Sequence, residues 1–405
     1  MHVIAPARYQ QQPQRRSSKR PFAVALLAVA FAAAGINFFR PLPTPVATLT
    51  VSIPAAASNP VMPWPSEGQA AIAADGYGLL GTSGTLTPLA TASIAKVITA
   101  LCVLQKAPLN IGQAGPTYTV TADDVAIYQN YIDQNGSLIL VVQGEQLTEY
   151  QALEALMLPS ANNIADSLVR WVFGSQQAYT AYATSWLEQN DLNDTRIGPD
   201  ASGYDAGTMS TASNLASLGL LAIQDPVLME IAGKSSTTLP VAGRVTNYDT
   251  ILGVNGITGL KTGNNDADPG AFLFTANAQI GDKTIPLTGS VMGAADLDTA
   301  LQNSTQLVAA MQQGFEELTV AHANQQVGTL KSVWGTSTPI TSAKTLELVR
   351  WKAVPLTATH SLDPKIRSGT IGNLKLAAGN SRAESKLQLA HPLPGPGFWW
   401  RLTRH

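Results

Sequence analysis

The chain has 405 residues, of which only 13% are charged, and its net charge is −2. Because this balance provides no basic surface for nucleic acid, we expect no nucleic-acid partner. The single cysteine, Cys102, rules out an internal disulfide and a cysteine-ligated metal, and no histidine lies between residues 3 and 321. A Ser-His-Asp triad and a histidine-ligated zinc are therefore excluded from the central part of the chain.

The N-terminus has the composition of an export segment. Residues 1–20 carry five basic side chains and no acidic one, and residues 21–39 are uncharged and mostly apolar. A helix of this length spans about 28 Å, which is enough to cross a bilayer core. Because the basic residues come first, we expect a cytoplasmic tail at 1–20, a transmembrane signal-anchor at 21–39 and export of the rest. The alternative is a signal peptide cleaved near residues 32–34, which would make the protein secreted.

A proline-rich segment separates the apolar run from the folded part. Residues 40–66 contain seven prolines among small residues, which predicts an extended linker that holds a domain away from the membrane. The folded part is expected from residue 67 and begins with a hairpin. Its strands at 71–74 and 77–81 are joined by Asp75-Gly76.

An apolar helix is predicted over residues 93–105, with Ser93 and Lys96 one turn apart on the same face. A serine hydroxyl is a poor nucleophile until a neighbouring group takes its proton. A lysine amine in an apolar wall stays neutral enough to take it. The same spacing fits a helix N-cap at Ser93 and a solvated Lys96, so the pair by itself leaves both interpretations open.

A second polar triplet lies in a turn between helices. An amphipathic helix from residue 150 breaks at Pro159, which places Ser160-Ala161-Asn162 in a loop before another helix at 164–173. Such a loop between two buried helices holds functional side chains firmly.

The third triplet, Lys261-Thr262-Gly263, ends a predicted strand at 256–263. Antiparallel neighbours are expected at 271–276 and 285–292, followed by a closing helix at 297–318. Strands, helices, strands and a final helix predict an α+β domain over residues 67–320.

From residue 321 to the C-terminus the predicted elements are short and alternate apolar and polar residues, as half-buried strands do. This pattern predicts a small all-β domain and tail over 321–405. The tail contains Trp399-Trp400, which could rest at a membrane interface or pack against the β domain. The strands are expected at 328–333, 345–351, 354–359 and 372–376.

The motifs Ser-x-x-Lys, Ser-x-Asn and Lys-Thr-Gly occur here in the order typical of penicillin-binding proteins and class A β-lactamases. With its flanking residues, the sequence resembles the serine-type D-Ala-D-Ala carboxypeptidases, the low-molecular-mass penicillin-binding proteins of the peptidase S11 family. The resemblance implies a transpeptidase/β-lactamase-like fold, in which helices flank an antiparallel sheet and a helical lobe is inserted in mid-sequence. It also implies activity outside the cytoplasm on peptidoglycan stem peptides, inhibition by β-lactams, and no metal or cofactor.

The resemblance assigns the catalytic steps to particular residues. Ser93 attacks the carbonyl between the two D-alanines, Lys96 takes its proton and Ser160 relays a proton to the leaving amine. The backbone N–H groups of Ser93 and Asn264 form the oxyanion hole.

The same resemblance assigns the substrate-binding residues. Asn162 holds Lys96 and the substrate amide, while Lys261 and Thr262 bind the terminal carboxylate, which needs a cation once it loses water. Gly263 leaves the strand edge free, so that the peptide can lie along it as an added strand.

The chain departs from the family around these motifs. Asn264-Asn265 stand where relatives usually have an aromatic residue or histidine and then threonine, and residue 163 is Asn where Asp is common. These changes leave substrate preference and rate open. A DD-endopeptidase, a β-lactamase and a non-catalytic wall-binding scaffold stay as alternatives, although Ser-Ala-Asn in place of Ser-Asp-Asn argues against the β-lactamase.

Overall fold

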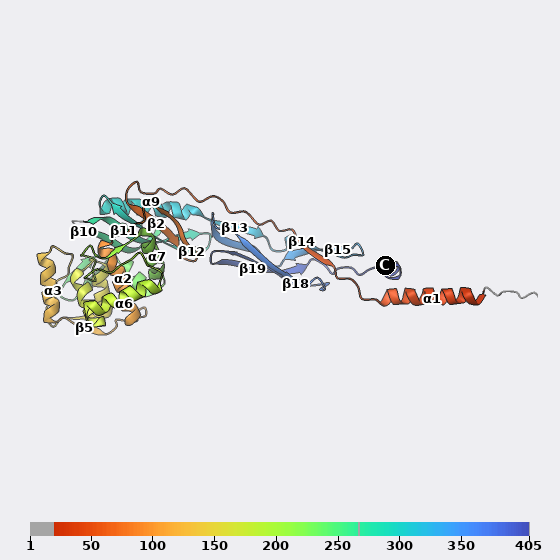
Figure 1. The fold of residues 1–405 in the computed structure, drawn as a ribbon, viewed down its shortest axis with the longest axis horizontal. Coiled ribbons are helices and arrows are strands. Elements are labelled where there is room, and N and C mark those ends of the chain that lie inside the picture. Colours follow the sequence, from red (N-terminus) through yellow and green to blue (C-terminus); the bar gives the residue numbers. More distant parts are fainter. Residues whose placement is uncertain (1–19, 266–267, 405) are drawn as a thin grey trace, which may run out of the picture.

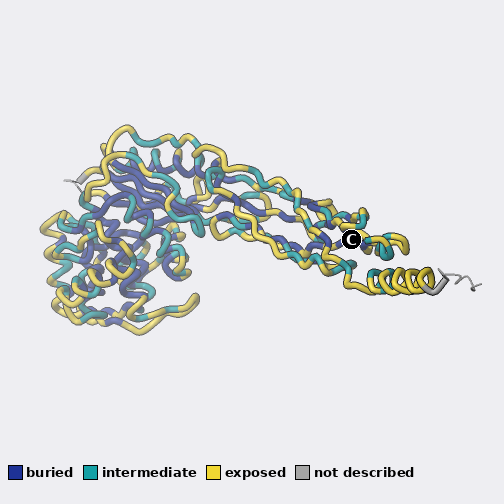
Figure 2. Tube along the Cα trace, turned by 45° about the vertical axis from the view of Figure 1, so that its right-hand side comes forward, coloured by how far each residue is buried: buried dark blue, intermediate teal, exposed yellow. Residues whose placement is uncertain are grey.

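The computed structural model describes residues 20–265 and 268–404. The molecule is elongated (Figure 1): helix α1 (Arg20–Phe39) lies at one end, a β domain follows, and the larger α+β domain lies at the far end. By itself, α1 is the single described helix that is long and apolar enough to cross a membrane, as a membrane anchor or a signal peptide would be. Most of α1 is exposed (Figure 2). Four of the five basic residues expected in the N-terminal tail lie outside the described residues.

The α+β domain is built on a five-stranded antiparallel sheet in the order β10-β11-β12-β2-β3. The expected hairpin is present, and a turn at residues 75–77 joins β2 to β3. The three later strands are longer than the sequence suggested. Their bounds are β2 (Gln69–Ala74), β3 (Gly78–Ser83), β10 (Ile257–Asn265), β11 (Asp268–Ile280) and β12 (Lys283–Ala294).

Both faces of this sheet are covered, which explains why all of β2 is buried. Ile72 and its neighbours on one face pack against α9 (Leu297–Gly314). Ala71 and Ala73 point the other way and pack with α2 (Ala95–Lys106) and α7 (Ala212–Ile223). The alternation follows from the two-residue period of a strand. The predicted antiparallel sheet with helices on both faces is confirmed.

The inserted helical lobe lies between α2 and α7. It consists of α3 (Ala122–Asp133), α4 (Glu149–Met157), α5 (Asn162–Phe173) and α6 (Gln176–Gln189), and α8 (Pro226–Ala232) follows α7. Short strand pairs complete the domain: β4 (Leu89–Ala90) with β7 (Met209–Ser210), β5 (Thr117–Thr119) with β6 (Gln146–Thr148), and β8 (Ser236–Leu239) with β9 (Gly243–Thr246).

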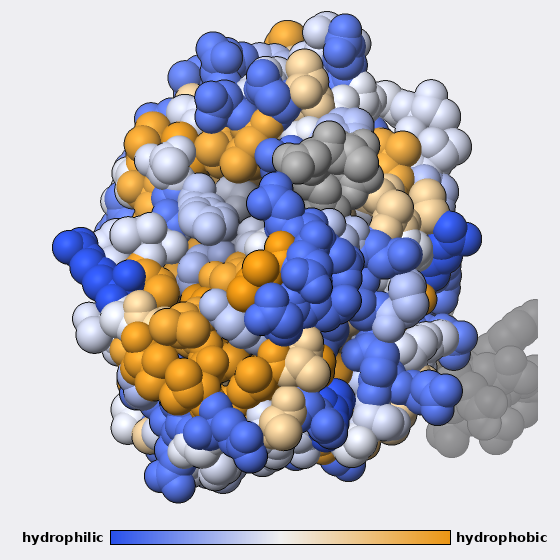
Figure 3. All heavy atoms as spheres, turned by 90° about the vertical axis from the view of Figure 1, so that its left-hand side faces the viewer, coloured by the Kyte–Doolittle hydropathy of each residue, from blue (hydrophilic) through white to orange (hydrophobic). Residues whose placement is uncertain are grey.

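At the end of the molecule remote from α1, hydrophobic patches are interspersed among hydrophilic side chains (Figure 3).

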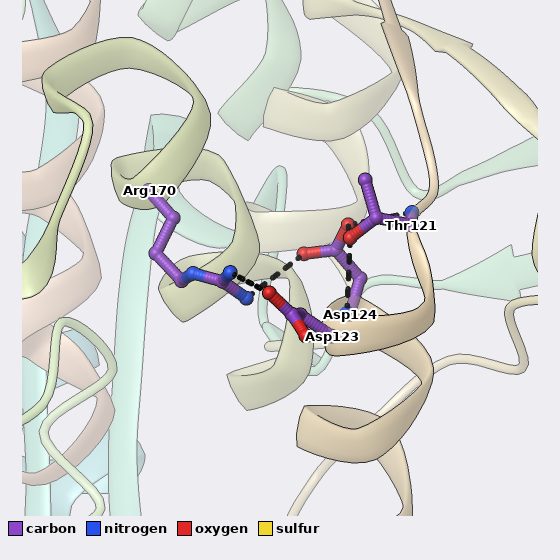
Figure 4. Close-up of polar contacts among 4 residues, drawn as sticks. All are labelled: Thr121, Asp123, Asp124 and Arg170. Carbon is purple, nitrogen blue, oxygen red and sulfur yellow. Dashed lines mark hydrogen bonds and ion pairs between the residues drawn. The ribbon is translucent and has the colours of Figure 1, made fainter.

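Polar contacts fix α3 against α5 (Figure 4). Thr121 caps α3 and exchanges hydrogen bonds with Asp124, which satisfies free N–H groups of the first turn. Arg170 of α5 contacts Asp123 at 2.6 Å and Asp124 at 3.7 Å. These contacts hold the lobe that carries the Ser160 loop.

The C-terminal part folds as a β domain from β13 to β19, as expected, and a short helix follows in the tail. A six-stranded sheet in the order β1-β14-β15-β19-β18-β17 shares a separate hydrophobic core with the pair β13-β16. The strands from β13 onward, in the sheet and in the pair together, are β13 (Phe315–Ala321), β14 (Gln326–Lys331), β15 (Ser337–Ser342), β16 (Leu346–Trp351), β17 (Thr357–Leu362), β18 (Thr370–Ala378) and β19 (Ser381–Leu389).

The proline-rich segment contributes a strand to this sheet. β1 (Val46–Leu49) forms the edge of the sheet and pairs with β14, within residues that composition assigned to an extended linker. Beyond it, the Arg350 guanidinium donates to the carbonyls of Pro54 and Ala55. The segment therefore runs along the β domain on its way to β2 (Figure 1).

The closing helix α9 is shorter than predicted, because it ends at Gly314 and not near residue 318. A Cβ atom at Gly314 would lie 2.1 Å from the Trp351 ring, so only glycine allows this approach. The next residues form β13 and pair with β16. Long-range pairing overrides the local helical periodicity here. The strand predicted at 354–359 also begins later, at Thr357.

Candidate active site

Ser93 and Lys96 lie where the 3-10 helix η1 (Ala92–Ile94) continues into α2. Lys96 Nζ is 2.8 Å from Ser93 Oγ, as the one-turn spacing predicts. Lys96 is fully buried, so the interpretation of a solvated lysine beside an N-cap is wrong. The N-cap residues are Thr91 for η1 and Ile94 for α2, so Ser93 is not an N-cap.

Two further contacts orient the Lys96 amine. Nζ donates to Asn162 Oδ1 at 2.7 Å and to the Ser202 carbonyl at 3.0 Å. Burial lowers the pKa of Lys96 well below its ordinary value, and the nearby Lys261 charge lowers it further, although Asp200 and Asp166 oppose the shift. A neutral amine has two N–H donors and one lone pair. Because both oxygens can only accept, the lone pair is left to face the Ser93 hydroxyl.

Ser160 lies between α4 and α5 with an unusual backbone. Its φ is +60°, a left-handed conformation that is rare for a residue with a side chain. Its Oγ is buried and has no hydrogen-bond partner among the described residues, so it does not bond to Ser93 or Lys96. Asn162, two residues on, begins α5, and its backbone N–H donates to the Ser137 carbonyl at 2.8 Å. Backbone strain of this kind is concentrated at functional sites.

Lys261, Thr262 and Gly263 lie on β10, the edge strand of the sheet. A Cβ atom at Gly263 would lie 2.8 Å from the Thr91 carbonyl, so the strand passes directly against η1 and the Ser93 turn. Lys261 is buried and donates to the Thr262 carbonyl at 3.2 Å. Burial lowers the pKa of Lys261 to about 7, against the opposing charge of Asp249.

Four of the predicted site residues come together from three distant segments. Ser93, Lys96 and Asn162 are in direct contact, and Lys261 is near enough to lower the pKa of Lys96. Asn264 lies on β10 after the triplet and is exposed. Residues 266–267 are outside the described chain.

The loop over residues 198–207 supplies functional contacts that the motif analysis missed. Its Ser202 carbonyl holds Lys96, and at Gly203, where φ is +72°, a Cβ atom would lie 2.1 Å from the Ala92 carbonyl. Only glycine lets this loop touch the Ser93 turn. The Ser202-Gly203 pair, which is similar to a segment of the family, marks this loop in the sequence, but a backbone carbonyl acceptor leaves no trace there.

A buried acid on the lobe holds this loop in place. Asp166 of α5 accepts from Tyr131 Oη at 2.8 Å and from the Ala201 N–H at 2.9 Å. Burial raises the pKa of Asp166 to about 6. The sequence did offer a signal for Asp166, because this residue follows Asn162 by four positions on an amphipathic helix.

Comparison with known proteins agrees with this geometry. The sequence matches the D-alanyl-D-alanine carboxypeptidases over residues 74–296. The chain belongs to this family, peptidase S11. It is 24% identical over 274 residues to the D-alanyl-D-alanine carboxypeptidase DacD of Escherichia coli, a match covering 63% of this chain and 68% of the relative. It is 25% identical over 262 residues to the Salmonella typhimurium DacD, covering 60% of this chain and 64% of that one.

Solved structures share the fold. Penicillin binding protein 6B from Escherichia coli superposes with a TM-score of 0.59 at 20% identity, over 84% of this chain and 99% of that one. A peptidoglycan synthesis regulatory factor from Streptococcus pneumoniae gives 0.60 at 16% identity, over 84% and 99%. The prediction of a D-Ala-D-Ala carboxypeptidase with a penicillin-binding-protein fold is thus confirmed.

Proposed function

We propose that this carboxypeptidase removes the terminal D-alanine from peptidoglycan stem peptides through an acyl-enzyme on Ser93. The observation that carries the proposal is the buried Lys96 amine, 2.8 Å from the Ser93 hydroxyl. Its lowered pKa favours the neutral amine, which can act as a base, in a region that contains no histidine.

The first step is acylation. Ser93 Oγ attacks the carbonyl carbon of the penultimate D-alanine while its proton passes to Lys96. The negative charge that develops on the carbonyl oxygen is stabilised by the backbone N–H groups of Ser93 and Asn264. The C–N bond then breaks, and the departing amine of D-alanine takes up a proton through Ser160. Water hydrolyses the resulting ester and restores the Ser93 hydroxyl.

The substrate is positioned on the edge of the sheet. Its backbone pairs with β10, where Gly263 presents no side chain. Its terminal carboxylate is held by Lys261 in the ammonium form and by Thr262, while Asn162 binds the scissile amide region. Burial of Lys261 supports this role, because an amine out of water is best balanced by an incoming anion.

The proposed location is the outer side of the cell membrane. The apolar helix α1 would anchor the chain there, with the basic tail in the cytoplasm and the catalytic domain outside. The β domain lies between α1 and the active site (Figure 1), so it would hold the catalytic domain away from the bilayer.

The decisive experiment is intact-mass measurement after incubation with a reporter penicillin. We expect one stable acyl adduct on the parent protein, no adduct on Ser93→Ala, and full labelling of the control Ser337→Ala, which alters an exposed serine of β15. Release of D-alanine from a pentapeptide, compared with cleavage of a cross-linked dimer, then separates carboxypeptidase from endopeptidase. Rapid turnover of the penicillin would indicate a β-lactamase, and an unlabelled parent would contradict the enzyme mechanism.

A further inference from the structure

A polar hollow lies where the end of α1 meets the β domain, at the opposite end of the molecule from Ser93. It has a volume of about 550 Å³ and is bounded by residues 42–45, which follow α1, and by the C-terminal tail. Three cationic side chains line it: Lys365 and Arg367 from the turn between β17 and β18, and Arg401 from helix α10 (Phe398–Thr403).

Nothing acidic neutralises these cations within the described chain. Lys365, Arg367 and Arg401 form no ion pair there, and residues 391–404 contain no acid. The carboxylate of Asp363, on the same turn, accepts from the backbone N–H of Lys365 at 3.0 Å and borders a different hollow. The hollow is therefore a concentration of unpaired positive charge.

The two arginines are held in place by aromatic rings. The Arg367 guanidinium lies over the Trp334 ring, 4.8 Å from its centre, and Arg401 lies over Phe38 at 5.4 Å. Stacking fixes the plane of each guanidinium and leaves its N–H groups free to donate at the edge. Such a pre-ordered fork suits the oxygens of a phosphate.

The C-terminal tail, which lines the hollow, is tied to α1. The Arg404 guanidinium donates to the Asn37 carbonyl at 2.6 and 2.9 Å, and the rings of Phe38 and Phe398 are 5.6 Å apart. Phe398 and Trp399 are 61% and 74% exposed, next to the end of the apolar helix. Trp400 instead packs on Trp334 of the β domain. Exposed aromatic rings at the end of a spanning helix mark the headgroup level of a bilayer.

We propose that this hollow binds the phosphate headgroup of an anionic glycerophospholipid, whose acyl chains lie along the exposed apolar surface of α1. The cations match the charge of the headgroup, and the aromatic rings and α1 provide the adjoining apolar surface. The inference rests on the proposed membrane anchoring of α1. Because β1 follows α1 after six residues and is part of the β domain, a lipid held here would also fix the tilt of that domain on the membrane.

The test uses the full chain in neutral detergent, titrated with phosphatidylglycerol or phosphatidylcholine, with bound lipid counted by native mass spectrometry. We expect the parent to bind phosphatidylglycerol about tenfold more tightly than phosphatidylcholine. Lys365→Gln/Arg401→Gln should abolish this preference. Lys344→Gln/Lys386→Gln removes the same charge from exposed positions of the β domain outside this hollow and should retain it.

A charge-preserving variant, Lys365→Arg/Arg401→Lys, should also retain the preference. It shows whether the loss in Lys365→Gln/Arg401→Gln comes from the missing charge or from misfolding. Equal binding of the two lipids by the parent, or a preference that survives in Lys365→Gln/Arg401→Gln, overturns the proposal. An equal loss of lipid preference in the Lys344→Gln/Lys386→Gln control also overturns it. Recovery of the full chain from cells without detergent would do the same. Release of D-alanine, measured on each preparation, should be unchanged, and its absence in all of them would contradict the proposed function and not the lipid site.

Discussion

The catalytic domain and the β domain bury cations in opposite ways. In the β domain, Arg350 is 3% exposed and pairs with Glu316 at 2.9 Å. It also donates to the carbonyls of two residues in the strand-forming N-terminal segment. In the catalytic domain, Lys96 and Lys261 are equally buried, yet neither pairs with a carboxylate within the described chain.

This contrast separates a structural charge from a functional one. A buried charge without a partner is unfavourable for folding, so the amine becomes neutral or waits for an anion. Arg350 has its anion already and therefore holds segments together. In the proposed mechanism, Lys96 takes up a proton and Lys261 receives the substrate carboxylate. Replacing these buried cations one at a time tests the contrast between the two domains.

The largest effect is expected from Lys96→Met. Without a base, acylation by penicillin should slow by about a thousandfold. The unfolding temperature should stay within a few degrees of the parent. Burial lowers the pKa of Lys96 below its unfolded value, so this lysine opposes folding at neutral pH, and that cost is absent from the variant. Acylation kinetics and thermal unfolding measured on one preparation check both parts. A marked loss of stability would place Lys96 with Arg350 as a structural cation.

Arg350→Met should show the opposite behaviour. It leaves Glu316 and two carbonyls without their donor, and we expect the free energy of unfolding to fall by about 3 kcal/mol. Acylation should be unaffected. The control Lys375→Met removes an exposed cation that lies 3.6 Å from Glu384, and should cost less than about 1 kcal/mol. Denaturant unfolding compares the two variants, and equal losses would show that burial of Arg350 adds nothing.

Two glycines with similar backbones sharpen the comparison further. Gly203 (φ +72°) touches the Ser93 turn, whereas Gly335 (φ +86°) of the β domain has no atom within 4 Å of a Cβ position. Alanine at either position meets the same backbone penalty, roughly 1 kcal/mol. Gly203→Ala alone should displace Ala92 and slow acylation by about a hundredfold. Similar acylation rates in the two variants would mean that the 198–207 loop does not position the nucleophile.

The smallest effect concerns pH. The pKa of Lys261 is about 7, so its charge is present below that pH and is lost above it. Because the substrate carboxylate needs the charge, kcat/KM for a D-Ala-D-Ala peptide should fall about tenfold per pH unit above about 7. In Lys261→Arg the group stays charged, so this descending limb should disappear, even though the overall rate is lower. An unchanged limb in the variant would assign it to another group.

Much of the catalytic domain was predictable because its signals are local. The hairpin at β2 and β3 carries its turn residues, and the Ser93 helix carries its apolar period. The three motifs, in their order, led to the family. The length of α9 was mispredicted because its end depends on Trp351, which lies 37 residues beyond Gly314 in the chain.

The sequence by itself determined which chemical groups are present: a serine without any histidine nearby, two lysines in apolar surroundings, and an apolar helix preceded by basic residues. Tertiary structure decided how these groups behave. Burial lowered the pKa of Lys96, the Ser202 carbonyl oriented its amine, and pairing with β14 drew the proline-rich segment into the β domain. The physical reason is that composition and periodicity report local preferences. The pKa of an amine and the pairing of an edge strand, by contrast, depend on atoms brought close by folding.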